Sequence, residues 1–71
     1  MKFTNVVDQA DYELLEYRKL YGIFPNNIIM DIGTYHLLKE ELGMPMYLSL
    51  SRFKGMRLLV VFTEERFIEF I

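Results

Sequence analysis

Leu58-Leu59-Val60-Val61-Phe62 is the longest apolar run in the chain, with Arg57 before it and Glu64 and Glu65 after it. A strand with one face in water alternates apolar and polar residues. A short unbroken run rich in β-branched and aromatic side chains is instead typical of a strand buried on both faces. We therefore predict that residues 58–62 form the central strand of a sheet.

The length and residue types predict one small domain covering residues 1–71. A core of this size rarely supplies more than roughly 3–5 kcal/mol, and small domains usually add a disulfide, a metal or a partner subunit. The chain has no cysteine and one histidine, His36, which leaves little basis for a disulfide or a zinc site. The remaining sources of stability are close packing of the core or self-association.

Composition and net charge indicate which class of protein this is. Leu, Ile, Val and Phe make up 26 of the 71 residues, which is far above the range of disordered chains. The net charge of −2 and the isoelectric point near 5.2 give no general attraction to nucleic acid or anionic lipid. No apolar run is long enough to cross a bilayer. We expect a cytoplasmic protein that does not bind membranes.

The first helix is marked by its charges. Asp8 is a suitable N-cap, Arg18 and Lys19 stand near the C-terminal end, and Gly22 supplies a stop. Apolar residues recur at helical spacing between these signals, at Ala10, Leu14, Tyr17, Leu20 and Tyr21. This pattern predicts an amphipathic helix lying on a sheet. Residues 1–7 have no clear period and form either a short edge strand or an arm over the core.

The rest of the chain predicts a strand, a helix and three more strands. Asp31 ends the first strand and caps the helix, and Gly43 closes it. The predicted elements are a strand at 28–30, a helix at 32–42, and strands at 46–51, 58–62 and 67–71. We expect the last three strands to form an antiparallel meander, with a right-handed crossover placing the first strand beside it.

These elements define an α+β fold with the order (β)αβαβββ. Two amphipathic helices pack on one face of a small, mainly antiparallel sheet of three to four strands. The other face has no obvious cover. In addition, Glu40 and Glu41 lie at the negative end of the second helix, where basic residues are preferred, so we expect a nearby group to compensate them.

The patterns that carry enzyme chemistry are weak. His36 and Glu40 share a helical face and Asp31 lies one turn earlier, but acidic residues on a helix are ordinarily its wet face. Ser49 and Ser51 lack a nucleophile elbow, and the isolated glycines form no phosphate-binding loop. We expect no enzyme activity, no metal and no cofactor.

Cations gather around Gly55. Arg52, Lys54 and Arg57 stand beside the aromatic Phe53. Basic residues interleaved with aromatic ones on a β-ribbon hold phosphates and stack on bases, so these four form a candidate contact for nucleic acid or an acidic partner. The alternative is an exposed hairpin kept soluble by its cations, which the acidic chain favours.

The uncovered sheet face and the last strand favour self-association. The candidate residues are Tyr47, Phe67, Phe70 and Ile71. The sequence therefore predicts a small protein-interaction module, either a homo-oligomer or a binder of another protein, with a nucleic-acid-binding regulator as the alternative.

Residues 25–62 also resemble a known segment. Pro25-Asn-Asn-Ile-Ile-Met30, an Asp-started helix and Gly55-Met-Arg-Leu-Leu-Val-Val61 resemble the strand, helix and Gly-led strand in the axial domain of tailed-bacteriophage major capsid proteins. Those proteins are several times longer and commonly have Asn-Pro at the helix start, where this chain has Asp31-Ile32-Gly33. The resemblance implies a small phage- or prophage-type accessory protein rather than a shell protein. Only the structural Asp31 and Gly55 carry over.

Overall fold

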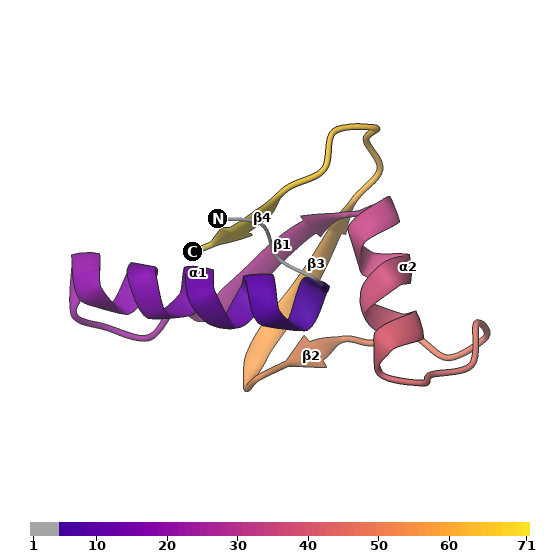
Figure 1. Ribbon diagram of the computed structural model, residues 1–71, viewed down its shortest axis with the longest axis horizontal. Helices are drawn as coiled ribbons and strands as arrows, with labels where there is room; N and C mark the ends of the chain where they lie inside the picture. The colour runs from indigo at the N-terminus through magenta and orange to yellow at the C-terminus, as the bar shows by residue number, and fades with distance from the viewer. Residues whose placement is uncertain (1–4) are drawn as a thin grey trace.

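A computed structural model describes residues 5–71. The edge strand or arm predicted for residues 1–7 is wrong at Val6 and Val7, which form the first turn of a helix, and residues 1–4 lie outside the described part of the chain. The elements in chain order are α1 (Val6–Tyr21), β1 (Asn27–Asp31), α2 (Ile32–Glu41), β2 (Arg52–Phe53), β3 (Met56–Val61) and β4 (Ile68–Phe70), as Figure 1 shows. Two helices pack on a mixed four-stranded sheet, so the predicted α+β fold class is confirmed.

The strand order is β2-β3-β1-β4, which corrects the predicted topology. β1 is parallel to β3 on one side and antiparallel to β4 on the other, so the first strand separates two members of the expected meander. Ile28 and Met30 of β1 are completely buried. β3 and β1 are therefore the two inner strands, so residues 58–61 lie in a central strand as predicted, and a parallel crossover inserts β1 between β3 and β4.

Burial along β3 alternates, so the prediction of a strand enclosed on both faces was wrong. Met56 and Leu58 are buried, whereas Leu59 is 38% exposed, Val61 42% and Phe62 83%. The reason is that α1 and α2 share one face of the sheet. Their core residues belong to one cluster with Ile28, Met30 and Leu58, namely Val6, Ala10, Tyr35 and Leu38. The five-residue apolar run thus has one face in the core and one face open.

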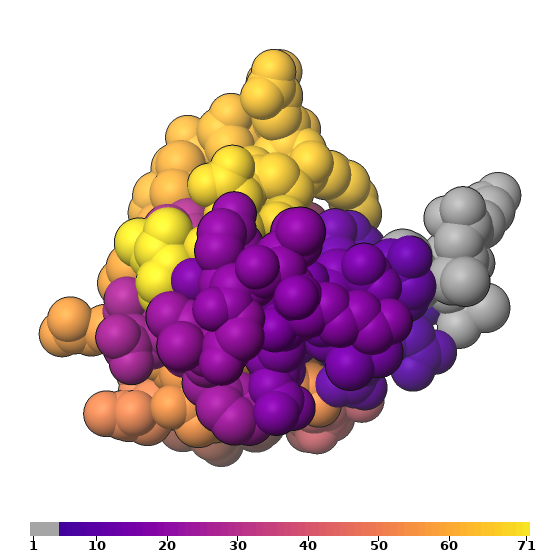
Figure 2. Space-filling view, turned by 90° about the vertical axis from the view of Figure 1, so that its left-hand side faces the viewer, coloured from indigo at the N-terminus to yellow at the C-terminus, as the bar shows by residue number. Residues whose placement is uncertain are grey.

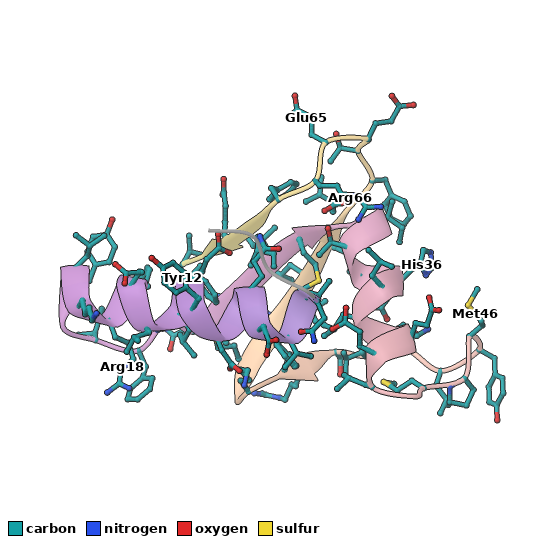
Figure 3. All side chains as sticks on the ribbon, viewed as in Figure 1. Tyr12, Arg18, His36, Met46, Glu65 and Arg66 are labelled. Atoms are coloured by element: carbon teal, nitrogen blue, oxygen red, sulfur yellow. The ribbon has the colours of Figure 1, made fainter. Side chains whose placement is uncertain are left out.

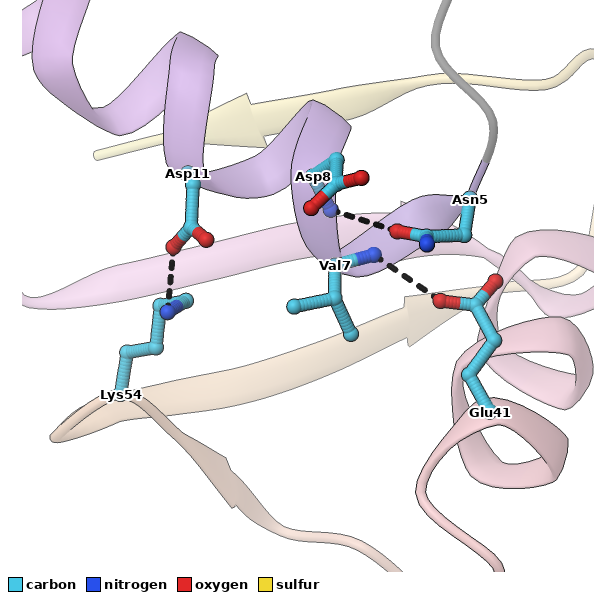
Figure 4. A network of polar contacts seen from close by, with 6 residues as sticks. All are labelled: Asn5, Val7, Asp8, Asp11, Glu41 and Lys54. Atoms are coloured by element: carbon cyan, nitrogen blue, oxygen red, sulfur yellow. Dashed lines mark hydrogen bonds and ion pairs between the residues drawn. The ribbon is translucent and has the colours of Figure 1, made fainter.

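Helix α1 begins at Val6, and its N-cap is Asn5 rather than the predicted Asp8. The Asn5 side chain accepts from the N–H of Asp8 at 2.8 Å. Across the helix–helix contact, the Glu41 carboxylate accepts from the N–H groups of Val6 at 2.8 Å and Val7 at 3.0 Å (Figure 4). The positive end of α1 therefore compensates Glu41 at the negative end of α2, as expected for one of that acidic pair.

Asp31 performs the predicted capping role and a second one. Its Oδ2 accepts from the N–H of Thr34 in the first turn of α2, and its Oδ1 accepts from the N–H of Phe67 just before β4, both at 3.0 Å. Burial by itself raises the pKa of the Asp31 carboxyl, but the hydrogen bonds from Thr34 and Phe67 outweigh burial and lower it. A Cβ on Gly33 would lie 3.2 Å from Oδ2, so the capping carboxylate occupies that space.

Residues 46–51 do not form the predicted strand; they belong to a long connection that joins α2 to β2. Lys39 donates to the carbonyl of Met46 at 3.0 Å, and the N–H of Leu50 donates to the Tyr35 hydroxyl at 2.8 Å. These side chains of α2 hold Met46 and Leu50 near the helix, and the segment reaches β3 at Ser51, whose carbonyl accepts from the N–H of Leu58 at 2.9 Å. Met46 is 80% exposed and extends away from the core (Figure 3).

Candidate interaction surface

One face of the sheet is free of helices, and we call it the open face. Cross-strand partners share a face, so the registers place the open-face residues in rows. They are Arg52 of β2; Arg57, Leu59 and Val61 of β3; Asn27 and Ile29 of β1; and Glu69 of β4. Leu59 and Val61 are exposed and Ile29 is half-buried. The centre of the open face is therefore apolar, with arginines toward β2 and a glutamate on β4.

The predicted basic group is divided by the hairpin. Arg52 and Arg57 lie directly opposite one another on the open face. Phe53 lies on the helix-covered face and is 9% exposed, so its ring is not presented with the arginines. Lys54, at the turn, forms an ion pair with Asp11 of α1 (Figure 4). The hairpin thus presents two of the four predicted contact residues together.

The predicted self-association residues also divide. Tyr47 is 85% exposed in the connection before β2, away from the sheet. Phe70 pairs with Ile28 on the helix-covered face, where its ring centroid lies 6.0 Å from that of Tyr17. Continuing the alternation of β4 places Phe67 and Ile71 on the open face.

Sequence reasoning did not assign Ile29, Leu59 and Val61 to this surface, because their apolar runs indicated burial on both faces. The sequence did contain a signal for this open face, because it predicts two apolar strands but only two amphipathic helices to cover them. Two helices that contact one another on one face leave the second face unprotected.

The residues considered for a metal site do not converge. Both carboxylate oxygens of Asp31 accept backbone N–H groups inside the protein, whereas His36 is exposed and points away from the core (Figure 3). Over residues 5–71, no group of three His, Asp or Glu side chains is placed to hold a metal ion. In the same range, no helix has the length and apolar character needed to span a membrane.

Searches of protein-family models, curated proteins and solved structures found no match to this chain. The function of the protein is therefore inferred from the geometry of its own residues.

Proposed function

We propose that the protein is a small, non-enzymatic interaction module that self-associates through the open face. The single observation that carries the proposal is the apolar centre of the open face, where Leu59 and Val61 are exposed and Ile29 is half-buried, on a sheet whose other face is covered by α1 and α2. A contiguous exposed apolar patch with a polar rim is typical of a protein–protein interface.

The charges at the rim favour a second copy as the partner. Arg52 lies on the edge strand β2, and Glu69 lies on the opposite edge strand β4. A two-fold axis between two stacked sheets and parallel to their strands brings β2 of one copy over β4 of the other. Arg52 of each copy then lies within side-chain reach of Glu69 of its partner, while the apolar centres meet on the axis.

The size of the open face sets the expected affinity. Strands lie about 4.8 Å apart, and the inner strands β1 and β3 have five and six residues, so the four-stranded face measures at most roughly 19 by 20 Å. Two such faces bury less area than a standard-size interface and fall in the range of weak, transient complexes. We therefore expect a dimer that dissociates in the micromolar range rather than an obligate dimer.

A charge-reversal series tests the pairing. Arg52→Glu and Glu69→Arg each place like charges opposite one another in the dimer, so each single variant weakens association. The double variant restores the opposite charges and regains most of the lost affinity, measured by sedimentation equilibrium. Glu64→Arg, at an exposed turn after β3, provides a matched control for the charge change. Two weakened single variants without recovery in the double variant would contradict the pairing.

The arginine pair supports a second candidate function, which is binding of nucleic acid. Arg52 and Arg57 are like charges placed directly opposite, and two phosphate oxygens would stabilise them. On this alternative, replacing Arg52, Lys54 and Arg57 with alanine abolishes retention of oligonucleotides and flattens its salt dependence. The absence of retention by the wild-type protein at low salt would exclude this candidate.

The resemblance of residues 25–62 extends the proposal to a cytoplasmic accessory protein of a phage or prophage, acting in virion assembly. The proposal is supported by the element order over these residues, which is β1, then α2 capped by Asp31, then β2 and β3 joined by a turn at Gly55. Neighbouring virion-assembly genes would support this extension. A divergent promoter beside the gene would favour the regulator instead.

A further inference from the structure

A pocket of about 330 Å³ lies between the C-terminal half of α1 and β4, away from the apolar centre of the open face. In Figure 2 the yellow C-terminal residues lie against the purple helix that forms the other wall. The lining residues are Glu13, Glu16, Tyr17, Leu20, Tyr21, Ile68, Glu69 and Phe70. Three of these residues are aromatic, and Glu13 and Glu16 of α1 are acidic.

The aromatic part of the wall is continuous. Tyr17 lies between the other two rings, with its centroid 4.6 Å from that of Tyr21 and 6.0 Å from that of Phe70. The planes of Tyr17 and Tyr21 are inclined by 49°, and those of Tyr17 and Phe70 by 56°. All three rings line the pocket, and aromatic faces attract organic cations.

The acidic part of the wall contains an unsatisfied group. Oε2 of Glu13 is enclosed, and no donor among residues 5–71 hydrogen-bonds to it. Burial raises the pKa of the Glu13 carboxyl, and a hydrogen bond with the Gln9 side chain only partly offsets this. Glu13 thus lines the same pocket as the three aromatic rings, and a carboxylate that turned toward a bound cation would gain the partner that Oε2 lacks.

We propose that this pocket binds a small organic ammonium ion, with Glu13 as its counter-ion and Tyr17, Tyr21 and Phe70 as its walls. A hard metal cation fits poorly, because Ca²⁺ and Mg²⁺ require several oxygen ligands and three of the lining residues are aromatic. Glu16, which also lines the pocket, is half-buried and lies 3.6 Å from Lys19, so that lysine already compensates part of its charge. This inference does not depend on self-association, because the pocket lies within one chain.

Titration of the wild-type protein with choline, followed by amide NMR shifts, tests the proposal. We expect saturable shifts confined to the pocket residues of α1 and β4. The neutral isostere 3,3-dimethylbutan-1-ol, which has the same shape without the charge, should produce none. Equal shifts with the neutral compound, or no shifts with choline up to about 50 mM, would overturn the proposal. Shifts with a trimethyl-lysine peptide alone would also overturn it, in favour of a protein ligand.

Two variants separate binding from folding. Glu13→Gln should weaken choline binding about tenfold or more while leaving the protein folded, because it removes the counter-ion. Tyr21→Leu should weaken binding about two- to fivefold, since Tyr21 is 64% exposed and its loss leaves the core intact. Tyr47→Leu, at an exposed tyrosine outside the pocket, is the matched control and should bind as the wild type does. Unchanged binding by Glu13→Gln would exclude Glu13 as the counter-ion.

Discussion

Arg52 and Arg57 are cross-strand partners in the β2–β3 hairpin, with both side chains on the face of the sheet that no helix covers. Like charges placed directly opposite one another destabilise an antiparallel pair. The two-residue turn of Lys54 and Gly55, both with positive φ, places positions 52 and 57 opposite one another, but it does not require an arginine at either position. The two arginines are therefore placed to bind an acidic group at the open face. In the proposed dimer, this group is Glu69 of the second copy.

The variant Arg52→Thr separates these two effects. Removing one arginine relieves repulsion in the monomer, so at low protein concentration its stability should rise by about 0.2–1 kcal/mol. The same change removes a contact of the dimer, so association should weaken. Chemical unfolding of dilute protein and sedimentation of concentrated protein measure the two effects separately. A loss of monomer stability would show that the arginines are satisfied within one chain.

Replacing Glu41 with alanine should detach the N-terminus of α1 from α2. The Glu41 carboxylate accepts two backbone N–H groups of α1, and hydrogen bonds to charged groups contribute about 1.5–3 kcal/mol each before relaxation. We expect Glu41→Ala to lower the free energy of unfolding by about 1–3 kcal/mol in a urea titration. The neighbouring Glu40→Ala is the control, because Glu40 is exposed, and it should change stability by less than about 0.5 kcal/mol. Equal effects at the two positions would contradict the capping role.

The ionised Asp31 carboxylate stabilises the fold, so we expect the free energy of unfolding to fall in acid as this carboxylate is protonated. Hydrogen bonds lower its pKa in the folded state, so its contribution is present above the ordinary value near 3.9. It is lost as the pH falls from about 4 through the lower pKa of the folded state. The variant Asp31→Asn should be less stable at neutral pH and should lose part of this acid dependence. Unfolding curves of both proteins from pH 7 into the acid range measure the difference, and parallel profiles would contradict it.

Glu13 should have the opposite pH dependence. Burial raises its pKa in the folded state, so its favourable contribution is present below the ordinary value near 4.3 and is lost as the pH rises through the folded-state pKa. The variant Glu13→Gln should therefore gain stability relative to the wild type as the pH rises from 4 to 7. Thermal unfolding at the two pH values tests this. A constant difference would show that the carboxyl is not perturbed by its surroundings.

Local signals in the sequence were sufficient for the helices and their ends. Gly22 ends α1 in a left-handed conformation and Asp31 caps α2, both as predicted, because capping depends on the chemistry of a few adjacent residues. The cap at Asn5 was missed, since Val6 and Val7 follow it without a recognisable period. Here the contact of Val6 with the core outweighs the local charge pattern.

The strand order and the open face could not be predicted in the same way. The apolar run at residues 58–62 is compatible with burial on both faces or with one face awaiting a partner, and one chain does not distinguish them. The alternation at residues 46–51 predicted a strand, but Lys39 and Tyr35 hold that segment at α2. Such long-range side-chain contacts leave no periodic signal in the sequence. The turn at Lys54 and Gly55 sets the register of the hairpin, and this register places Arg52 and Phe53 on opposite faces of the sheet.

Sedimentation equilibrium of the wild type and Leu59→Lys, from about 5 to about 500 μM, tests the central claim most directly. Leu59 lies in the apolar centre of the open face and is already 38% exposed, so the lysine is tolerated in a monomer. The control Leu15→Lys changes the same residue type on α1, where Leu15 is 49% exposed. We predict a reversible dimer for the wild type and for Leu15→Lys, and a monomer for Leu59→Lys. A wild-type protein that remains monomeric over the whole range would contradict self-association through the open face.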